Sequence, residues 1–387
     1  MKKKSLIIII FLVSILFCGN AKAQDNFADF DLFGAINQEI DKLNLTDFED
    51  SFNDLPNEIA DIWQDNNISD ILTNYAKGKN ILNIEDIGFS LLNVLKGALN
   101  SNILTIGALI ALAILSGIVS QIKSSFGTQT SDAASFVLYL MSMTLVVYVF
   151  ASTVIQTKDA IAKSVEIMQF SFPPLLTLLL SSGQTAQAGI VQPATVLLTT
   201  TISSLVQNVL LPMVLVLSVT VIIGNMSNSL QLNKLQKLIK TVLKWAIGAV
   251  GTIYVGALSL QGIGAKGFDS MTMRTTRFAL DKFIPYVGGI VSGSADTILN
   301  ISLLLKNALG ITSVLLMLST LLMPIIKIIG AQLSLRIVAA LVEPLGNDGL
   351  AKSISEIGDV MGYLFAIVIL QAIMFILTVG AVIGWAT

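Results

Sequence analysis

The sequence predicts an all-α fold: a polytopic membrane helical bundle with internal repeats and two re-entrant hairpins, preceded by a small N-terminal extracytoplasmic helical domain. Of the 387 residues, 54% are hydrophobic, and the mean hydropathy is +0.79. Charged residues make up 12%, about half the ~25% typical of a soluble domain, so the chain cannot cover itself with a charged surface. Long apolar runs alternate with short polar gaps, which is typical of a chain that crosses a membrane several times.

The composition also excludes several kinds of chemistry. Histidine is absent, and the single cysteine is Cys18. This removes His general bases, Ser-His-Asp triads, zinc sites built from Cys or His, and disulfides within the chain. The glycine-rich stretch at 262–267 lacks the spacing of a phosphate-binding loop, and no basic surface suited to nucleic acid is present. We therefore expect no enzyme activity, no cofactor and no metal site.

Residues 1–23 have the pattern of a secretory signal peptide. A basic start, Met1-Lys-Lys-Lys4, precedes an apolar core at 6–17, and Ala21-Lys-Ala23 supplies small residues for cleavage. An uncleaved N-terminal anchor is the alternative. Cleavage after position 23 would remove Cys18 and leave the mature chain without a cysteine.

Residues 24–100 form an acidic segment, with 15 Asp and Glu against four Lys, a net charge of −11. So few Lys residues are typical of a segment outside the cytoplasm. Apolar side chains between 51 and 65 recur at helical spacing, which predicts several short amphipathic helices. They are Phe52, Leu55, Ile59, Ile62 and Trp63. Two interpretations stay open, namely a solvated cap that keeps the outer face soluble and a docking surface for a partner protein.

Residues 101–387 are expected to form a multi-span membrane domain. About six apolar stretches are each long enough for a hydrocarbon core of ~30 Å. They are Ile103–Ile122, Phe136–Ile155, Val206–Gly224, Trp245–Ile263, Ser313–Ile329 and Tyr363–Trp385.

Similar sequences recur along this domain. Leu95-Lys-Gly-Ala-Leu99 precedes the first span, and Leu305-Lys-Asn-Ala-Leu309 precedes the fifth. Pro174 and Pro285 lie 111 residues apart (285 − 174) within two similar segments. These features predict internal repeats near 86–192, 193–300 and 301–387. The alternative is coincidence between apolar segments of low complexity.

The distribution of Lys and Arg predicts the topology. Lys234, Lys237, Lys240 and Lys244 lie on one side of an amphipathic helix, which we expect on the cytoplasmic membrane face, drawn to anionic lipid. With the N-terminal segment outside, the third span would bring the chain inside to meet these lysines. The same topology leaves the four bases between 266 and 282 outside, which weakens it.

Two segments rich in Pro, Gly and Ser, at 170–183 and 283–296, are predicted to form the re-entrant hairpins. Proline stops helices, and irregular backbone at membrane depth is tolerated only inside protein or beside water. Paired interrupted segments of this kind indicate a transport pathway. The candidate pathway residues are Pro173, Pro174, Gln184, Pro285, Gly288, Gly289, Gly293, Ser294 and Asp296. Asp296 is either an intramembrane functional carboxylate or a cap of the helix that follows, and the Gly288-Gly289 pair equally fits plain helix packing.

Two segments carry a family resemblance, Lys266-Gly-Phe-Asp-Ser-Met-Thr-Met-Arg-Thr-Thr-Arg-Phe278 and Phe283-Ile-Pro-Tyr-Val-Gly-Gly-Ile-Val-Ser-Gly-Ser-Ala-Asp-Thr297. With the signal peptide and the acidic segment, the chain resembles the stage III sporulation protein AE family of endospore-forming bacteria. The resemblance implies a membrane-embedded core subunit of the transenvelope channel complex between mother cell and forespore, required for forespore development. It also implies a multi-pass location in the mother-cell membrane facing the forespore. The implied partners are a secretion-type ATPase, small membrane proteins and ring-forming proteins, with homo-oligomers left open.

The residues alone leave two other functions open. One is an autonomous secondary transporter whose hairpins bind a small solute. The other is a passive membrane scaffold on which other subunits assemble. The resemblance defines no catalytic residues, so none are assigned.

Overall fold

The computed structural model describes residues 32–63, 67–79, 81–82, 84–101, 103–121, 128–182, 185–226, 232–283, 288–345 and 348–384. Between 261 and 300 the description covers the backbone alone. Within the described ranges the chain is helical, apart from turns, short irregular stretches and one isolated β-bridge between Trp63 and Leu82. The prediction of an all-α fold is confirmed for this part of the chain.

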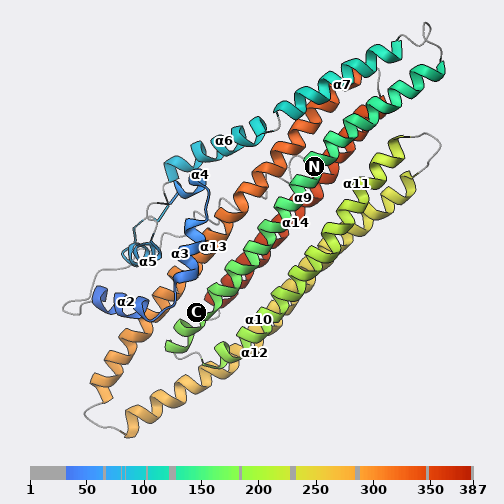
Figure 1. Cartoon of the computed structure of the whole chain (residues 1–387). Helices are drawn as coiled ribbons and strands as arrows, with labels where there is room; N and C mark the ends of the chain where they lie inside the picture. The colour runs from blue at the N-terminus through green and yellow to red at the C-terminus, as the bar shows by residue number, and fades with distance from the viewer. Residues whose placement is uncertain are drawn as a thin grey trace.

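Very long helices lie side by side and form the bundle (Figure 1). They are α9 (Thr128–Ser181), α10 (Thr185–Leu205), α11 (Leu211–Met226), α12 (Asn233–Phe283), α13 (Gly288–Val342) and α14 (Asp348–Gly384). One turn of π-helix, η1 (Val206–Leu210), joins α10 to α11 without a break. The 55 residues of α13 span about 80 Å at 1.5 Å per residue, which far exceeds a ~30 Å hydrocarbon core.

Short helices from the acidic segment pack along one side of this bundle (Figure 1). They are α2 (Leu32–Asp41), α3 (Thr46–Asn53), α4 (Asn57–Ala60), α5 (Ile68–Ala76) and α6 (Ile84–Ser101), followed by α7 (Ile103–Gln121). The five apolar residues at helical spacing between 51 and 65 are all buried. The Trp63 indole donates a hydrogen bond of 3.2 Å to Ser319 Oγ of α13, and the Phe48 and Phe170 rings meet edge to face at 4.8 Å. These helices therefore share their core with the bundle.

Within the described residues, five helical stretches are long and apolar enough to cross a membrane. They are Ala133–Ser181, Ala194–Met226, Asn233–Leu260, Ile301–Val342 and Asp348–Ile383. Five of the six predicted spans lie within or largely within them. The first predicted span, Ile103–Ile122, lies on α7, whose apolar stretch Ile103–Val119 is shorter.

The helix stop predicted at Pro173 and Pro174 is corrected by the structure, and the first re-entrant hairpin stays a prediction. Pro173 and Pro174 do not stop a helix, because α9 runs through both and ends at Ser181. Each proline removes one backbone N–H donor, but neighbouring helices and hydroxyl side chains satisfy freed backbone groups in apolar helices. The freed carbonyls are those of Gln169 and Phe170, four residues before the prolines. Near them, Ser171 Oγ donates to the carbonyl of Ile167 at 2.6 Å, and Thr177 Oγ1 donates to the carbonyl of Pro173 at 3.0 Å.

The second predicted hairpin is also not seen in the residues that the structure describes. α12 ends at Phe283 and α13 begins at Gly288, so long helices lie on both sides of residues 284–287. The glycines at 288, 289 and 293 belong to the first turns of α13 and not to a broken helix. Glycine costs only about 1 kcal/mol in a helix, and the length of α13 outweighs that cost. Pro285 lies outside the described residues.

The three internal repeats stay a prediction. The boundary near residue 300 falls inside the continuous helix α13, so the second and third proposed units are not separate in the backbone.

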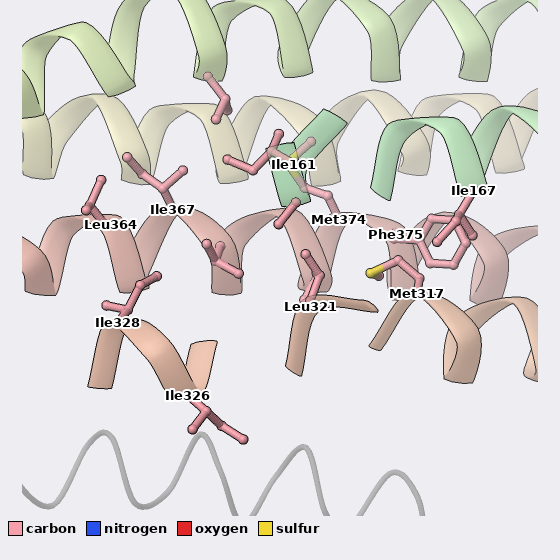
Figure 2. Close-up of a cluster of buried hydrophobic side chains, with 14 of the residues drawn as sticks. Ile161, Ile167, Met317, Leu321, Ile326, Ile328, Leu364, Ile367, Met374 and Phe375 are labelled. Atoms are coloured by element: carbon pink, nitrogen blue, oxygen red, sulfur yellow. The ribbon is translucent and has the colours of Figure 1, made fainter. Parts of the chain in front are cut away.

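The core of the bundle lies where α9, α13 and α14 meet. Figure 2 shows buried side chains from these three helices packed together. Ile161 and Ile167 come from α9, Met317 and Leu321 from α13, and Met374 and Phe375 from α14. Lipid tails are as apolar as these side chains, so tight packing rather than escape from water has to hold the helices together inside a bilayer.

Three pairs of helix ends meet at one end of the bundle (Figure 1). At this end α7 gives way to α9, α11 to α12 and α13 to α14. The Tyr139 hydroxyl of α9 donates to the Ile222 carbonyl of α11 at 3.0 Å and lies 2.9 Å from Ser353 Oγ of α14. These contacts hold α9, α11 and α14 in fixed register near the start of α12, which carries the lysine cluster.

Candidate functional site

Lys306 is a wholly buried lysine within the apolar part of α13. Its Nζ donates a hydrogen bond of 3.2 Å to the carbonyl oxygen of Ile383, in the last turn of α14. The last carbonyls of a helix lack intrahelical donors and form the negative end of its dipole. A buried ammonium group at this position therefore caps α14. An ionisable residue within a membrane helix is a functional candidate by default.

Ser302 and Gly310 lie one turn before and one turn after Lys306 on α13. Ser302 is fully buried, and its Oγ has no hydrogen-bond partner among the described residues. At Gly310, an added Cβ would lie 2.5 Å from Ile383 Cδ1 and 3.1 Å from Val379 Cγ1. α13 and α14 can approach this closely only because residue 310 has no side chain. The close approach brings Lys306 within reach of the end of α14.

A buried polar seam links α14 to α10 and α12. We use this name for Ser203 of α10, Tyr254 of α12, and Gln371 and Thr378 of α14. The Tyr254 hydroxyl is hydrogen-bonded to Thr378 Oγ1, and Gln371 Nε2 lies 3.5 Å from Ser203 Oγ. Gln371 Oε1 is buried without a partner among the described residues. The π-helical turn η1 starts three residues after Ser203, and such turns are frequent at functional sites.

An acid-lined cleft of about 420 Å³ lies between α3 and the bundle. Its walls come from α3, the middle of α9 and the Pro324 region of α13. An ion pair of 2.8 Å between Lys163 Nζ and Asp54 Oδ2 crosses it. The charged lining residues are Asp47, Asp50, Asp54, Asp159, Lys163, Glu166 and Lys327. Both partners of the ion pair are more than half exposed, so the pair fixes the orientation of α3 more than its stability.

A second, charged groove of about 680 Å³ lies between α13 and α14, near the end where α12 begins. Arg336 of α13 and Asp359 of α14 form an ion pair of 2.8 Å at this groove. Asn225 Nδ2 of α11 donates to Glu356 Oε2 at 3.1 Å. Both contacts place charged groups between helices, where each has a polar partner.

The described residues hold no group of three or more Asp, Glu, Cys or His side chains that could bind a metal ion. The polar features of the described residues are instead a buried cation at a helix end, a polar seam, and two charged clefts at different levels of the bundle. The expectation that the chain is not an enzyme stays a prediction.

The structure does not gather the sequence-predicted pathway residues into one site. Pro173 and Pro174 lie in α9, the second of them buried. Gln184 and Pro285 lie outside the described residues. The remaining candidates, Gly288, Gly289, Gly293, Ser294 and Asp296, lie in the first turns of α13, where the side chains are outside the description. The role of Asp296 therefore stays a prediction.

The lysine cluster is placed differently from its prediction. Lys234, Lys237, Lys240 and Lys244 occupy the first turns of α12, which continues without a break into an apolar stretch. The cluster is therefore not a separate helix, because good helix formers with no Pro run from the lysines into the span. On its inner face Gln236 is buried and donates through Nε2 to the Thr220 carbonyl at 2.9 Å.

Sequence reasoning missed Lys306 and Gln371. The available signal was a single basic or amide residue within a long apolar run, as in Leu303-Leu-Leu-Lys-Asn-Ala-Leu309. In the sequence, Lys306 stands within a repeated motif that precedes an apolar span, Leu305-Lys-Asn-Ala-Leu309. An intramembrane lysine is informative on its own, even without a neighbouring acid.

A helical bundle with five apolar helices of this length, joined by buried polar contacts, has the architecture of a multi-pass membrane protein. The chain belongs to the stage III sporulation protein AE family, whose model matches residues 66–386. Stage III sporulation protein AE of Bacillus subtilis (strain 168) is 28% identical over 279 residues, covering 72% of this chain and 70% of that protein. No solved structure gives a significant match. Family membership implies a role in stage III sporulation.

Proposed function

We propose that this protein is a membrane-embedded core subunit of the transenvelope complex of stage III sporulation, located in the mother-cell membrane. The observation that carries the proposal is the family match over 66–386, which includes every long helix of the bundle. Many large apolar side chains on α9, α11 and α12 are exposed, which suits helices that face lipid or other membrane subunits. The proposed partners are a secretion-type ATPase, small membrane proteins and ring-forming proteins.

Affinity purification of a tagged full-length chain from sporulating cells tests the partners. We expect these three classes of protein to be recovered, and an unrelated multi-pass protein carrying the same tag to recover none of them. Recovery of the chain alone, together with solute uptake by the purified chain in liposomes, would instead support an autonomous transporter.

A variant of Lys306 separates a core subunit from a passive scaffold. Lys306→Met keeps the volume of the side chain and removes its charge. If the chain acts only as a scaffold, a Lys306→Met protein that recovers all partners should support normal sporulation. If it is a working core subunit, the same protein should assemble normally and yet reduce spore formation.

We also propose that α2–α5 face outside the cytoplasm and that the start of α12 faces inside. Single cysteines introduced into a Cys18→Ser background test this orientation. Asp61 and Lys237 are both exposed, so the protein itself leaves a cysteine at either position open to the reagent. An impermeant maleimide should label Asp61→Cys and spare Lys237→Cys in intact cells, and the reverse result would invert the topology.

A further inference from the structure

We propose that the first three turns of α12 bind the headgroup of an anionic phospholipid at one surface of the membrane. This inference rests on the described residues of α12 and is independent of the proposed function in sporulation.

Three separate stripes run along these turns at about 100° per residue. Lys237, Lys240 and Lys244 follow one another at spacings of three and four and form a basic stripe within about 60°. The buried stripe holds Gln236, Ile239 and Leu243, which pack against the bundle. The third stripe is apolar but exposed. It lies beyond the buried stripe from Lys237, Lys240 and Lys244, and exposed Lys234 lies between it and those lysines on the other side of the helix. The members of this apolar stripe are Leu235, Leu238, Val242 and Trp245.

The basic stripe is not neutralised by the protein. Lys237 and Lys244 are exposed and Lys240 is partly exposed, and none of the three forms an ion pair with another described residue. The ion pairs of the described chain lie elsewhere, for example at the acid-lined cleft and at the charged groove. Among the described residues, three adjacent positive charges on one stripe are therefore open to a negative partner.

The exposed apolar stripe identifies that partner as a lipid. Leu238 is 59% exposed and lies one turn after Lys234 on the same side of the helix, and Trp245 is 77% exposed. A soluble phosphorylated ligand would satisfy the lysines and leave this stripe in water. A phospholipid satisfies both, because its headgroup meets the ammonium groups while the acyl chains cover Leu238. Trp is enriched at this membrane depth, and Lys side chains extend toward the headgroups.

The position of the stripes along the helix fits this assignment. The lysines occupy the first turns of the stretch Asn233–Leu260, which is long and apolar enough to cross a membrane. Trp245 follows Lys244 directly and begins the uncharged part of the stretch. Along α12 the lysines therefore precede the apolar residues, in the same order as the charged headgroups and the apolar core of a bilayer.

Native mass spectrometry of the full-length chain in detergent tests the proposal with two defined lipids, phosphatidylglycerol and phosphatidylcholine. We expect phosphatidylglycerol to be retained preferentially. The triple variant Lys237→Gln, Lys240→Gln, Lys244→Gln should lose at least about tenfold in affinity for it, since each lysine near an anionic surface contributes about fivefold. A triple variant with Arg at the same positions should keep the preference.

The matched control removes three exposed lysines elsewhere, with Lys79→Gln, Lys96→Gln and Lys352→Gln. It should bind phosphatidylglycerol as the unmodified chain does. An equal loss in the control would assign the effect to net charge and overturn the proposal, as would equal retention of the two lipids. Displacement of phosphatidylglycerol by millimolar inorganic phosphate would also overturn it, since the site would then recognise a free anion.

A second measurement covers the case in which the Gln variant fails to fold. Brominated phosphatidylglycerol in vesicles should quench Trp fluorescence of the unmodified chain, and Trp245→Phe should lose most of that quenching. Quenching that is unchanged in Trp245→Phe would show that the lipid does not reach this stripe and would overturn the proposal.

Discussion

The inner pair of helices, α13 and α14, differs sharply from the outer pair formed by α10–α11 and α12. In an apolar stretch of 18 residues, 56% of the residues are buried in α13 and in α14, against 33% within Ala194–Met226 and 22% within Asn233–Leu260. Ala194–Met226 and Ile301–Val342 are nevertheless about equally apolar in sequence, with mean hydropathies of 2.3 and 2.2. Apolarity therefore indicates that a helix can enter the membrane, but it does not indicate which neighbour it meets there.

Different contacts hold the two pairs in place. The inner pair meets at Gly310, where the helices touch closely, and at Lys306, which caps α14. The outer helices are tied to the inner pair through single polar contacts, such as that between Tyr254 and Thr378. Because lipid offers outer side chains an equally apolar environment, close packing and polar bonds decide how firmly a helix is held. The inner pair should therefore be far more sensitive to substitution than the outer helices.

The largest effect is expected at Gly310. Gly310→Leu would force a side chain into Ile383 and Val379, and overpacking of this kind costs about 3 kcal/mol. We expect a marked loss of stability in an SDS unfolding titration of the purified chain. The matched control is Gly248→Leu on α12, where nothing lies within 4 Å of an added Cβ. An equal loss at Gly248 would remove the distinction between the two pairs.

The next effect is expected at Lys306. Lys306→Ala leaves a cavity and an unpaired carbonyl at the end of α14, which together cost about 2 kcal/mol. Lys306→Met fills the cavity and should lose less than Lys306→Ala in the same titration. If both variants unfold as the unmodified chain does, the contact between Lys306 and Ile383 contributes nothing to the stability of the inner pair.

Sequence reasoning reached the fold class and most of the spans because apolar runs longer than about 18 residues have few alternatives to a membrane helix. It missed how far the helices extend. The polar stretch of α9 around Lys158 and Lys163 interrupts the apolar pattern, and Pro173 is a helix breaker in water. Neither ends the helix, because α3 and α13 pack against α9, and Asp54 pairs with Lys163.

The candidate site was less predictable than the fold. Lys306 acts through the carbonyl of Ile383, 77 residues later in the chain, and no local pattern contains that pairing. The polar seam similarly combines single residues of α10, α12 and α14. The lysine cluster was recognised from spacing alone, but its three-stripe arrangement depended on knowing which face of α12 packs inward.

A smaller effect is expected where an outer helix meets the inner pair. Tyr254→Phe removes one hydroxyl from the polar seam and leaves the ring in place. Interhelical polar bonds of this kind contribute about 0.6 kcal/mol on average in membrane proteins. We expect a small shift in the SDS titration, well below that of Lys306→Ala. A loss as large as that of Gly310→Leu would mean that α12 belongs to the rigid core of the bundle.

The smallest effect is expected at the ion pair between Lys163 and Asp54, which joins the short helices to α9. Both side chains are more than half exposed, so solvent and salt screen the pair, and Lys163→Gln should cost at most about 0.5 kcal/mol. The buried contacts of Trp63 and Phe48 would still hold the short helices against the bundle. Limited proteolysis at low and high salt measures this directly: cleavage between α2 and α5 should rise slightly in the unmodified chain at high salt and should not respond to salt in Lys163→Gln. Release of the whole segment by Lys163→Gln would show that this ion pair, and not the shared apolar core, attaches the acidic helices to the membrane bundle.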